Sequence, residues 1–176
     1  MNSALFLDRD GVINIDFGYV HTKEKFIFNE GIFDLVASAN AKGYLVIIVT
    51  NQAGIGKGFY TERDFNILTE WMLGKFIDHG GKIDKIFFCP FHEDATIKKY
   101  KQKSFDRKPA PGMIQKACKE FNIDPKLSII VGDKISDIQA GISSNIDKTI
   151  YYGEDTCNLA YKSVSRLLDI KEELIC

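Results

Sequence analysis

Short, almost wholly apolar segments alternate with helical patterns along this chain, and the alternation constrains its fold more than any other feature. Residues 44–49 are apolar and rich in β-branched side chains, as in a strand that is covered on both faces. Similar runs predict strands at residues 4–7, 83–88, 127–131 and 149–152. We therefore predict an α/β fold in which a mainly parallel sheet lies between two layers of helices.

Between these runs, apolar side chains recur at helical spacing. One helix is predicted from Ile32 to Ala39, with Gly43 placed to end it. A second begins at a capping box in residues 61–64 and ends at Gly80-Gly81. Further helices are predicted from Pro111 to Phe121, from Ile135 to Ile142, and over residues 164–174 at the C-terminal end.

Composition limits the class of protein. A chain of 176 residues with 45% hydrophobic residues suits one domain over residues 1–176 with a core of its own. A net charge of -1 argues against a surface that binds nucleic acid, and no apolar run is long enough to span a bilayer. The cysteines, which form no CxxC pair, fit a reducing compartment: Cys89, Cys118, Cys157 and Cys176. We expect a cytoplasmic monomer.

Polar side chains follow the predicted strands. Asp8 and Asp10 come after the first strand, residues 50–51 after the second, and Asp133 after the fourth. Each has an ordinary explanation as a turn or helix-cap residue, and Lys108 could be a solvated side chain. Parallel strands, however, bring their carboxyl ends to one edge of a sheet, where ligands bind. Together these residues predict a site at that edge.

The chemistry that suits these residues is phosphoryl transfer through an aspartyl phosphate. One aspartate attacks phosphorus, and a second, two positions along, exchanges a proton. The hydroxyl of Thr50 would hold phosphoryl oxygens, while Lys108 and Mg²⁺ would offset the repulsion between two anions. At 4 Å and an effective dielectric constant of 20, that repulsion is about 4 kcal/mol, or roughly a thousandfold in rate. Cations are therefore required.

The motifs carry a resemblance to a known family. The Asp8-x-Asp10-Gly11, Thr50-Asn51, Arg107-Lys108-Pro109 and 132–137 segments resemble the motifs of the haloacid dehalogenase superfamily of phosphatases. Over residues 4–152, further segments such as Val12-Ile13-Asn14 and Gly18-Tyr19-Val20 are similar to the D-glycero-D-manno-heptose 1,7-bisphosphate phosphatase family. The related histidinol-phosphate phosphatases share much of this pattern.

The resemblance implies a role for each matching residue. Asp8 would be the nucleophile and a magnesium ligand, Asp10 the general acid and base with its carbonyl on the metal, and Asp133 another ligand. Thr50, Asn51 and Lys108 would hold the phosphate. Apart from the resemblance, the spacing of Asp137 indicates that it orients Lys108 or Lys134. Substrate contacts would come from Asp16, Phe17, Gly18, Tyr19, Asn51, Gln52, Ala53, Arg107 and Lys134, besides Thr50 and Lys108. The implied product, heptose 1-phosphate, feeds nucleotide-activated heptose for lipopolysaccharide core or other surface sugars.

The chain departs from the family in one loop. Many members hold a structural zinc there with three cysteines and a histidine, but here only Cys89 matches a ligand position. Phe91 stands where the histidine is usual, and Ser104-x-Asp106 replaces a Cys-x-Cys pair. We therefore predict no structural zinc. The basic run over residues 98–103 is either a solvated loop or a patch that meets the second phosphate of the substrate.

Other interpretations remain open from the sequence alone. The intervals between motifs leave no room for a cap domain over the site. Residues 54–58 match neither the dinucleotide-binding nor the P-loop pattern, so we interpret them as a flexible loop near the phosphate site. Histidinol phosphate is an alternative substrate, a polynucleotide 3′-phosphate is disfavoured by the charge, and a receiver-type signalling domain is the alternative outside enzymes.

Overall fold

In the computed structural model, which describes residues 1–175, six strands form one parallel sheet. The parallel sheet and five of its strands were predicted from the sequence, and β6 was not. The strands lie in the order β3-β2-β1-β4-β5-β6. Their bounds are β1 Ala4–Leu7, β2 Leu45–Asn51, β3 Lys85–Cys89, β4 Ile129–Gly132, β5 Lys148–Tyr152 and β6 Lys162–Val164. The order runs outward from β1 on one side and from β4 on the other. The carboxyl ends of β1 and β4 therefore flank a topological switch point, and α/β sheets bind ligands at such points.

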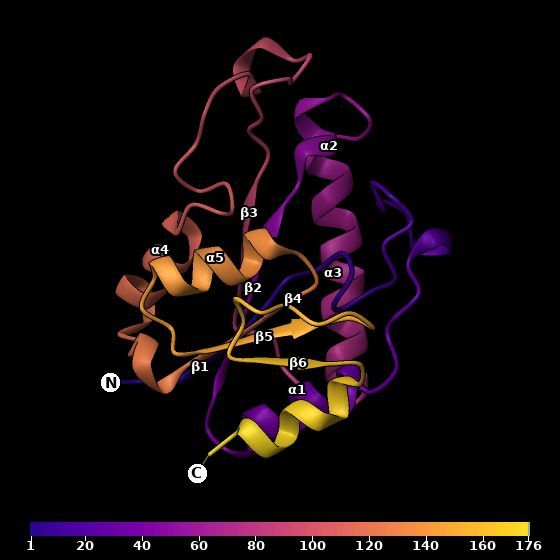
Figure 1. The fold of residues 1–176 in the computed structure, drawn as a ribbon. Helices are drawn as coiled ribbons and strands as arrows, with labels where there is room; N and C mark the ends of the chain where they lie inside the picture. Colours follow the sequence, from indigo (N-terminus) through magenta and orange to yellow (C-terminus); the bar gives the residue numbers. More distant parts are fainter. Residues whose placement is uncertain (176) are drawn as a thin grey trace.

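Helices cover both faces of this sheet (Figure 1). Helices α4 and α5 pack on one face, and α1, α3 and the C-terminal 3₁₀ helix η4 pack on the other. Their bounds are α1 Ile32–Ala41, α2 Ala53–Gly56, α3 Glu62–Asp78, α4 Gly112–Phe121, α5 Ile135–Ser143 and η4 Leu167–Glu173, with short 3₁₀ turns at η1 Lys23–Lys25, η2 Lys98–Tyr100 and η3 Pro125–Leu127. Within residues 1–175, none of these segments forms a separate cap unit, as predicted.

The apolar composition of the strands follows from this layering. Side chains of β1 alternate between faces, so Leu5 and Leu7 join the core under α1 and α3, while Phe6 joins the core under α4 and α5. Phe6 pairs with Ile47 of β2 and Ile130 of β4, and all three side chains are fully buried. Because both faces are covered, no position within β1 suits a polar side chain, and the first one, Asp8, comes directly after the strand ends at Leu7.

Two sequence-based predictions are wrong. The C-terminal helix predicted over residues 164–174 is divided, because Val164 ends strand β6 and only Leu167–Glu173 is helical, as a 3₁₀ helix. Its buried residues, Leu167 and Ile170, are three positions apart, which is the 3₁₀ period. The loop predicted at residues 54–58 contains the one-turn helix α2, whose glycines are buried. That segment is packed, since a Cβ on Gly54 would lie 2.3 Å from the ring of Tyr60.

We predict that α5 tolerates no side chain at Gly141. A Cβ there would lie 2.5 Å from Ile130 Cγ2 and 2.9 Å from Thr149 Cγ2, so Gly141→Ala should lower the free energy of unfolding by about 2 kcal/mol. Gly74 in α3 is the matched control, since nothing lies within 4 Å of its added Cβ. Gly74→Ala should raise the same quantity by up to about 1 kcal/mol. Urea unfolding measures both, and the opposite order would contradict this packing.

Candidate active site

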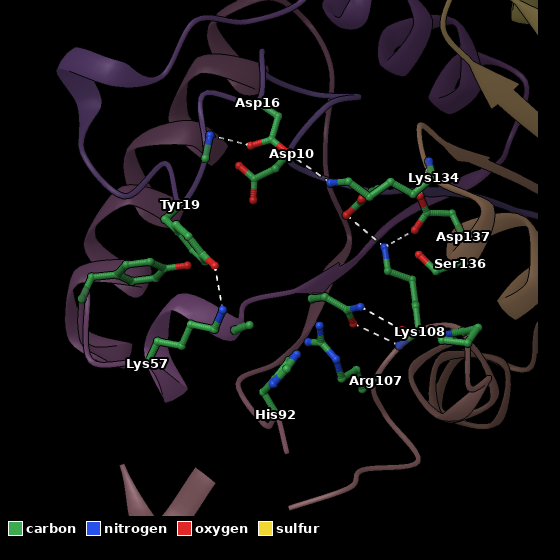
Figure 2. A pocket seen from close by; sticks show the side chains of 16 residues that line it. Asp10, Asp16, Tyr19, Lys57, His92, Arg107, Lys108, Lys134, Ser136 and Asp137 are labelled. Carbon is green, nitrogen blue, oxygen red and sulfur yellow. Dashed lines mark hydrogen bonds and ion pairs between the residues drawn. The ribbon is translucent and has the colours of Figure 1, made fainter. Parts of the chain in front are cut away.

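A cavity of about 700 Å³ opens at the carboxyl ends of the central strands (Figure 2). Of the residues singled out in the sequence, its lining includes Asp8, Asp10, Asp16, Gly18, Tyr19, Asn51, Ala53, Arg107, Lys108, Lys134 and Asp137. These residues come from four separate segments of the chain. Phe17, Thr50, Gln52 and Asp133 are not among the lining residues, although Gln52 contacts Asp10 and Asp133 lies 3.7 Å from Lys134 Nζ.

The ammonium group of Lys108 is the central cation of the site. Its Nζ lies 3.0 Å from Asp8 Oδ1 and 2.6 Å from Asp137 Oδ1, and it donates to the Val49 carbonyl at 2.7 Å. Lys108 is 3% exposed, so burial opposes its charge, yet the two carboxylates hold its pKa above the usual value. Burial raises the pKa of Asp8, and Lys108 opposes that shift. The residues after β1, β4 and the Arg-Lys-Pro motif therefore meet at one ammonium group.

The backbone at Lys108 is held by Asn51, at the end of β2. Asn51 Nδ2 donates to the Lys108 carbonyl and Asn51 Oδ1 accepts from the Lys108 amide, both at 3.0 Å. This two-way contact across 57 positions fixes where the lysine side chain starts. The amide of Asn51 is thus engaged within the protein, and its predicted contact with substrate stays a prediction.

Asp133 is placed against Asp8 by the glycine that follows Asp10. Gly11 has φ +99°, and a Cβ there would lie 2.2 Å from Asp133 Oδ2, so only glycine leaves room for this carboxylate. Burial and the neighbouring charge of Asp8 raise the pKa of Asp133 to about 7. Its Oδ1 is buried and has no hydrogen-bond partner in the structure. Burial of an unpartnered carboxylate oxygen is costly unless a cation or a donor meets it.

The acidic residues fit a magnesium ion. Asp8, Asp133 and Asp137 each offer an oxygen within 4.8 Å of the others, and carboxylate oxygen is the donor that Mg²⁺ prefers. Asp137 already accepts from the backbone amide of Lys134 at 3.0 Å and pairs with Lys108, so its oxygens are engaged. Asp8 and Asp133 are therefore the better side-chain ligands. The predicted role of the Asp10 carbonyl is not tested by these contacts.

Beside this cluster, the carboxylate of Asp10 is held within a separate network. Arg9 pairs with it at 2.8 Å, and Gln52 Nε2 donates to Asp10 Oδ2 at 3.0 Å and to Thr50 Oγ1 at 2.9 Å. Thr50 and Gln52 are almost wholly buried. The side chain of Gln52 is therefore directed at Asp10 and Thr50, and its predicted contact with substrate stays a prediction.

The segment that follows the first motif forms one wall of the cavity. Asp16 Oδ2 pairs with Lys134 Nζ at 3.1 Å, which ties this wall to the start of α5. Tyr19, at φ 53°, accepts a hydrogen bond from Lys57 Nζ at 2.9 Å. Phe17 is 58% exposed and does not line the cavity.

Sequence reasoning missed several lining residues, chiefly Lys57, Tyr60, His92 and Ser136. Lys57 lies across the cavity from Lys108, with His92 and Arg107 between them (Figure 2). The signal for Lys57 was present, because a glycine-rich segment directly after a strand often approaches a phosphate. His92 carried no signal in the sequence, since a lone histidine is more often an ordinary surface residue.

Comparisons with known proteins agree with this geometry. Residues 96–150 match the family model described as Haloacid dehalogenase-like hydrolase. Over 149 residues, the chain is 54% identical to the D-glycero-alpha-D-manno-heptose-1,7-bisphosphate 7-phosphatase of Burkholderia mallei, covering 85% of this chain and 79% of that protein. It is 41% identical over 143 residues to the D-glycero-beta-D-manno-heptose-1,7-bisphosphate 7-phosphatase of Escherichia coli K12, covering 81% and 75%.

Solved structures show the same fold. A HAD-like phosphatase of Mesorhizobium loti superposes with a TM-score of 0.89 at 31% identity, over 98% of this chain and 86% of that one. The D,D-heptose 1,7-bisphosphate phosphatase of B. bronchiseptica, which was crystallised with magnesium and phosphate, gives a TM-score of 0.84 at 24% identity, over 98% and 97%. Among the helices of residues 1–175, none combines the length and apolar character needed to cross a membrane.

The loop over residues 91–106 is held by aromatic packing and by hydrogen bonds to residues in and next to α2 and α3. Figure 1 shows the loop extending from the end of β3 on the same side of the sheet as α2. Tyr100 is 6% exposed, its hydroxyl donates to Glu62, and its ring lies 6.0 Å from that of Phe91. The Ile97 amide donates to the Gly56 carbonyl at 3.0 Å, and Thr96 Oγ1 donates to the Lys57 carbonyl at 2.9 Å. Phe91, at the position of a zinc-binding histidine in the family, thus contributes to a small apolar cluster.

The donor set of this loop does not fit zinc. Burial raises the pKa of the Cys89 thiol, whose Sγ lies 3.9 Å from the Phe91 carbonyl. Asp106 is paired with Lys116, and His92 Nδ1 accepts from the Asp94 amide at 2.9 Å. The basic run over residues 98–103 was predicted to be either a solvated loop or a patch for the second phosphate. Its Lys98, Lys99 and Lys101 are exposed and do not line the cavity, which favours the solvated loop.

We predict that the loop depends on aromatic packing and not on a metal. Tyr100→Ala should lower the free energy of unfolding by about 3 kcal/mol, whereas Phe105→Ala, 62% exposed on the same loop, should change it by less than about 0.5 kcal/mol. A zinc-selective chelator should leave the melting temperature of the unsubstituted protein unchanged. A melting temperature that falls with chelator, or equal effects of the two substitutions, would contradict this account.

Proposed function

Since this chain belongs to the D-glycero-D-manno-heptose 1,7-bisphosphate 7-phosphatase family of the haloacid dehalogenase superfamily, we propose that it hydrolyses the C7 phosphate ester of that heptose bisphosphate. The family resemblance noted in the sequence is thereby confirmed. The observation that carries the proposal is the meeting of Asp8, Asp133 and Lys108 at one site in a chain that is 54% identical to such an enzyme.

In this proposal, Asp8 is the nucleophile. Its Oδ1 is 3.0 Å from Lys108 Nζ, so a phosphoryl group that reached Asp8 would also lie beside a fixed positive charge. Thr50, at the end of β2, would help to hold the phosphoryl oxygens. Magnesium on Asp8 and Asp133 would supply further positive charge to the phosphate oxygens, and the Asp10 carbonyl would complete the protein ligands.

The reaction proceeds in two displacements. First, an Asp8 oxygen bonds to phosphorus while the bond from phosphorus to the C7 oxygen breaks, and Asp10 gives its proton to the departing sugar. A water oxygen then bonds to phosphorus, the bond to Asp8 breaks, and Asp10 takes the proton from that water. The products are heptose 1-phosphate and inorganic phosphate, and both aspartates return to their starting states.

The shape and charge of the cavity suit a bisphosphate. Lys108 and Lys134 lie at one end, and Lys57, Arg107 and His92 lie toward the other (Figure 2). A sugar with a phosphate at each end would place one anion beside Asp8 and Lys108 and the second toward Arg107. Asp16, Gly18, Tyr19, Ala53 and Lys134 also line the cavity and are proposed substrate contacts.

Further aspects of the proposal concern the whole protein. We propose that residues 1–176 form a single domain that acts as a monomer in the cytoplasm and supplies heptose 1-phosphate for nucleotide-activated heptose of lipopolysaccharide or other surface sugars. Cys89, Cys118 and Cys157 are free thiols, which is consistent with a reducing compartment, whereas Cys176 lies outside the described residues. The net charge of -1 supports a small anionic substrate over a polynucleotide.

We predict that the α anomer of the substrate is preferred. The relative at 54% identity is named for the alpha form, whereas those at 41–45% are named for the beta form. Magnesium-dependent phosphate release from both anomers should show a kcat/KM about tenfold higher for the α anomer, or ~1.4 kcal/mol in the barrier. Histidinol phosphate should be a poor substrate under the same conditions. Its preferential hydrolysis would overturn the proposed substrate.

We predict that Asp8→Asn abolishes hydrolysis, because an amide oxygen does not form the aspartyl phosphate. The rate should fall by at least about a thousandfold while the circular dichroism spectrum stays unchanged. Asp147→Asn is the matched control, since Asp147 lies in an exposed ion pair with Lys126. Mass spectrometry after acid quenching should find the added phosphoryl group on Asp8 of the unsubstituted enzyme. Retained turnover in Asp8→Asn would exclude Asp8 as the nucleophile.

A further inference from the structure

The carboxylate of Asp10 accepts hydrogen bonds from three side chains that have no role in the mechanism described above. Its Oδ1 accepts from Arg9 Nε at 3.2 Å, from Arg9 Nη2 at 2.8 Å and from Asn14 Nδ2 at 3.1 Å. Its Oδ2 accepts from Arg9 Nη2 at 2.8 Å and from Gln52 Nε2 at 3.0 Å. Three side chains thus fix the plane of one carboxylate that lines the cavity (Figure 2).

Arg9 is itself fixed by burial. It is 1% exposed, and its guanidinium carbon lies 5.9 Å from the centre of the Phe26 ring and 5.6 Å from that of Phe65. Its Nη2 also donates to the Val20 carbonyl at 2.6 Å. An arginine buried in this way is stable only when its charge is paired, and Asp10 provides the partner. The guanidinium therefore cannot turn away from Asp10 without a large cost.

The side chain of Gln52 is also fixed, by hydrogen bonds at both ends of its amide group. It is 1% exposed, its Nε2 donates to Asp10 Oδ2 and Thr50 Oγ1, and its Oε1 accepts from the Tyr60 hydroxyl at 2.5 Å. Burial raises the pKa of Tyr60, so this phenol remains a hydrogen-bond donor. A flipped amide would place Oε1 against the Asp10 carboxylate and its NH₂ group against the Tyr60 hydroxyl. Tyr60 thereby selects the amide orientation that supports Asp10.

We propose that Arg9, Asn14 and the Gln52–Tyr60 pair are positioning residues that select Oδ2 of Asp10 as the oxygen that carries the transferred proton. A carboxylate offers about four lone-pair sites. One Arg9 Nη2 hydrogen goes to Val20, so the other is shared between both Asp10 oxygens. Oδ1 also receives Arg9 Nε and Asn14 Nδ2, so three donor atoms reach it, whereas Oδ2 receives only Gln52 besides the shared Arg9 hydrogen and is the oxygen with room for the proton.

This inference rests on the proposed function, in which Asp10 protonates the leaving oxygen as the P–O bond breaks and later accepts a proton from water. A sugar alkoxide is a poor leaving group and needs that proton, whereas p-nitrophenolate is stable without it. A displaced Asp10 should therefore slow transfer from an alkyl phosphate and leave transfer from p-nitrophenyl phosphate nearly intact. It should also slow the hydrolysis of the phosphorylated enzyme, because that step needs a general base for either substrate.

The test compares Gln52→Met, which removes both the donor to Asp10 and the acceptor for Tyr60, with Tyr60→Phe, which removes only the hydroxyl. Gln52→Met should lower kcat for heptose bisphosphate by about tenfold to a hundredfold at unchanged KM. Phosphorylation by p-nitrophenyl phosphate should change by less than about threefold, so a burst of p-nitrophenol should precede slow turnover. Tyr60→Phe should show the same selectivity with a smaller loss.

Thr149→Val is the matched control, because it also removes a buried polar group but lies outside the cavity. Thr149, in β5, is 2% exposed, and its hydroxyl accepts from the Tyr161 amide at 3.2 Å. It should retain the activity of the unsubstituted enzyme with both esters. Arg9→Lys keeps the charge but loses the two-nitrogen contact, and should show the same leaving-group dependence where it folds.

Equal losses of the phosphorylation rate with both esters, a loss confined to KM, or no loss in either Gln52→Met or Tyr60→Phe would overturn the positioning role. The outcome is separable from the choice of substrate. If the unsubstituted enzyme prefers another alkyl phosphate, the proposed sugar is wrong, while the comparison of that ester with p-nitrophenyl phosphate still decides the role of Gln52 and Tyr60.

Discussion

The buried ammonium group of Lys108 is the interaction on which the rest of the site depends. It meets Asp8 after β1, Asp137 in α5 and the Val49 carbonyl in β2, so three elements converge on it. Asp8, Asp133 and Asp137 bring three carboxylates together, and two lysines, Lys108 and Lys134, pair with them. The remaining negative charge is what a divalent cation would offset. Removal of one partner from such a cluster would leave an unpaired buried charge.

How much of this could be predicted from sequence depends on the kind of information needed. Apolar runs predicted β1 to β5 because strands covered on both faces have a distinctive composition. Asp8, Asp133 and Lys108 could be brought together because topology places strand ends at one edge. Strand β6 is only three residues long, too short to show a period, and only its last residue, Val164, fell within a predicted element, the C-terminal helix. Burial of Arg9 could not be foreseen, since arginine is rarely buried and its partners come from distant segments.

The loop over residues 91–106 is held by the packing of aromatic and aliphatic side chains. Phe91 and Tyr100 contribute to an apolar cluster with Ile55 of α2 and Phe65 of α3. The cluster connects the loop to the site, because the loop also bonds to the Gly56 and Lys57 carbonyls, and Lys57 lines the cavity. Phe65 in addition packs against the Arg9 guanidinium. Order in the loop is therefore coupled to both walls of the cavity through a few shared side chains.

An active site without a cap must obtain its geometry from the sheet and the helices beside it. No second domain closes over Asp10 within residues 1–175 to orient it or to shield it from water. Asp10 is instead oriented by residues at the strand ends, because Arg9 follows the end of β1 and Gln52 follows the end of β2. Both are buried, so they stay rigid while the substrate side of Asp10 remains open. Groups held by strand ends keep their position without a conformational closure, and such preorganisation is what general acid and base catalysis requires.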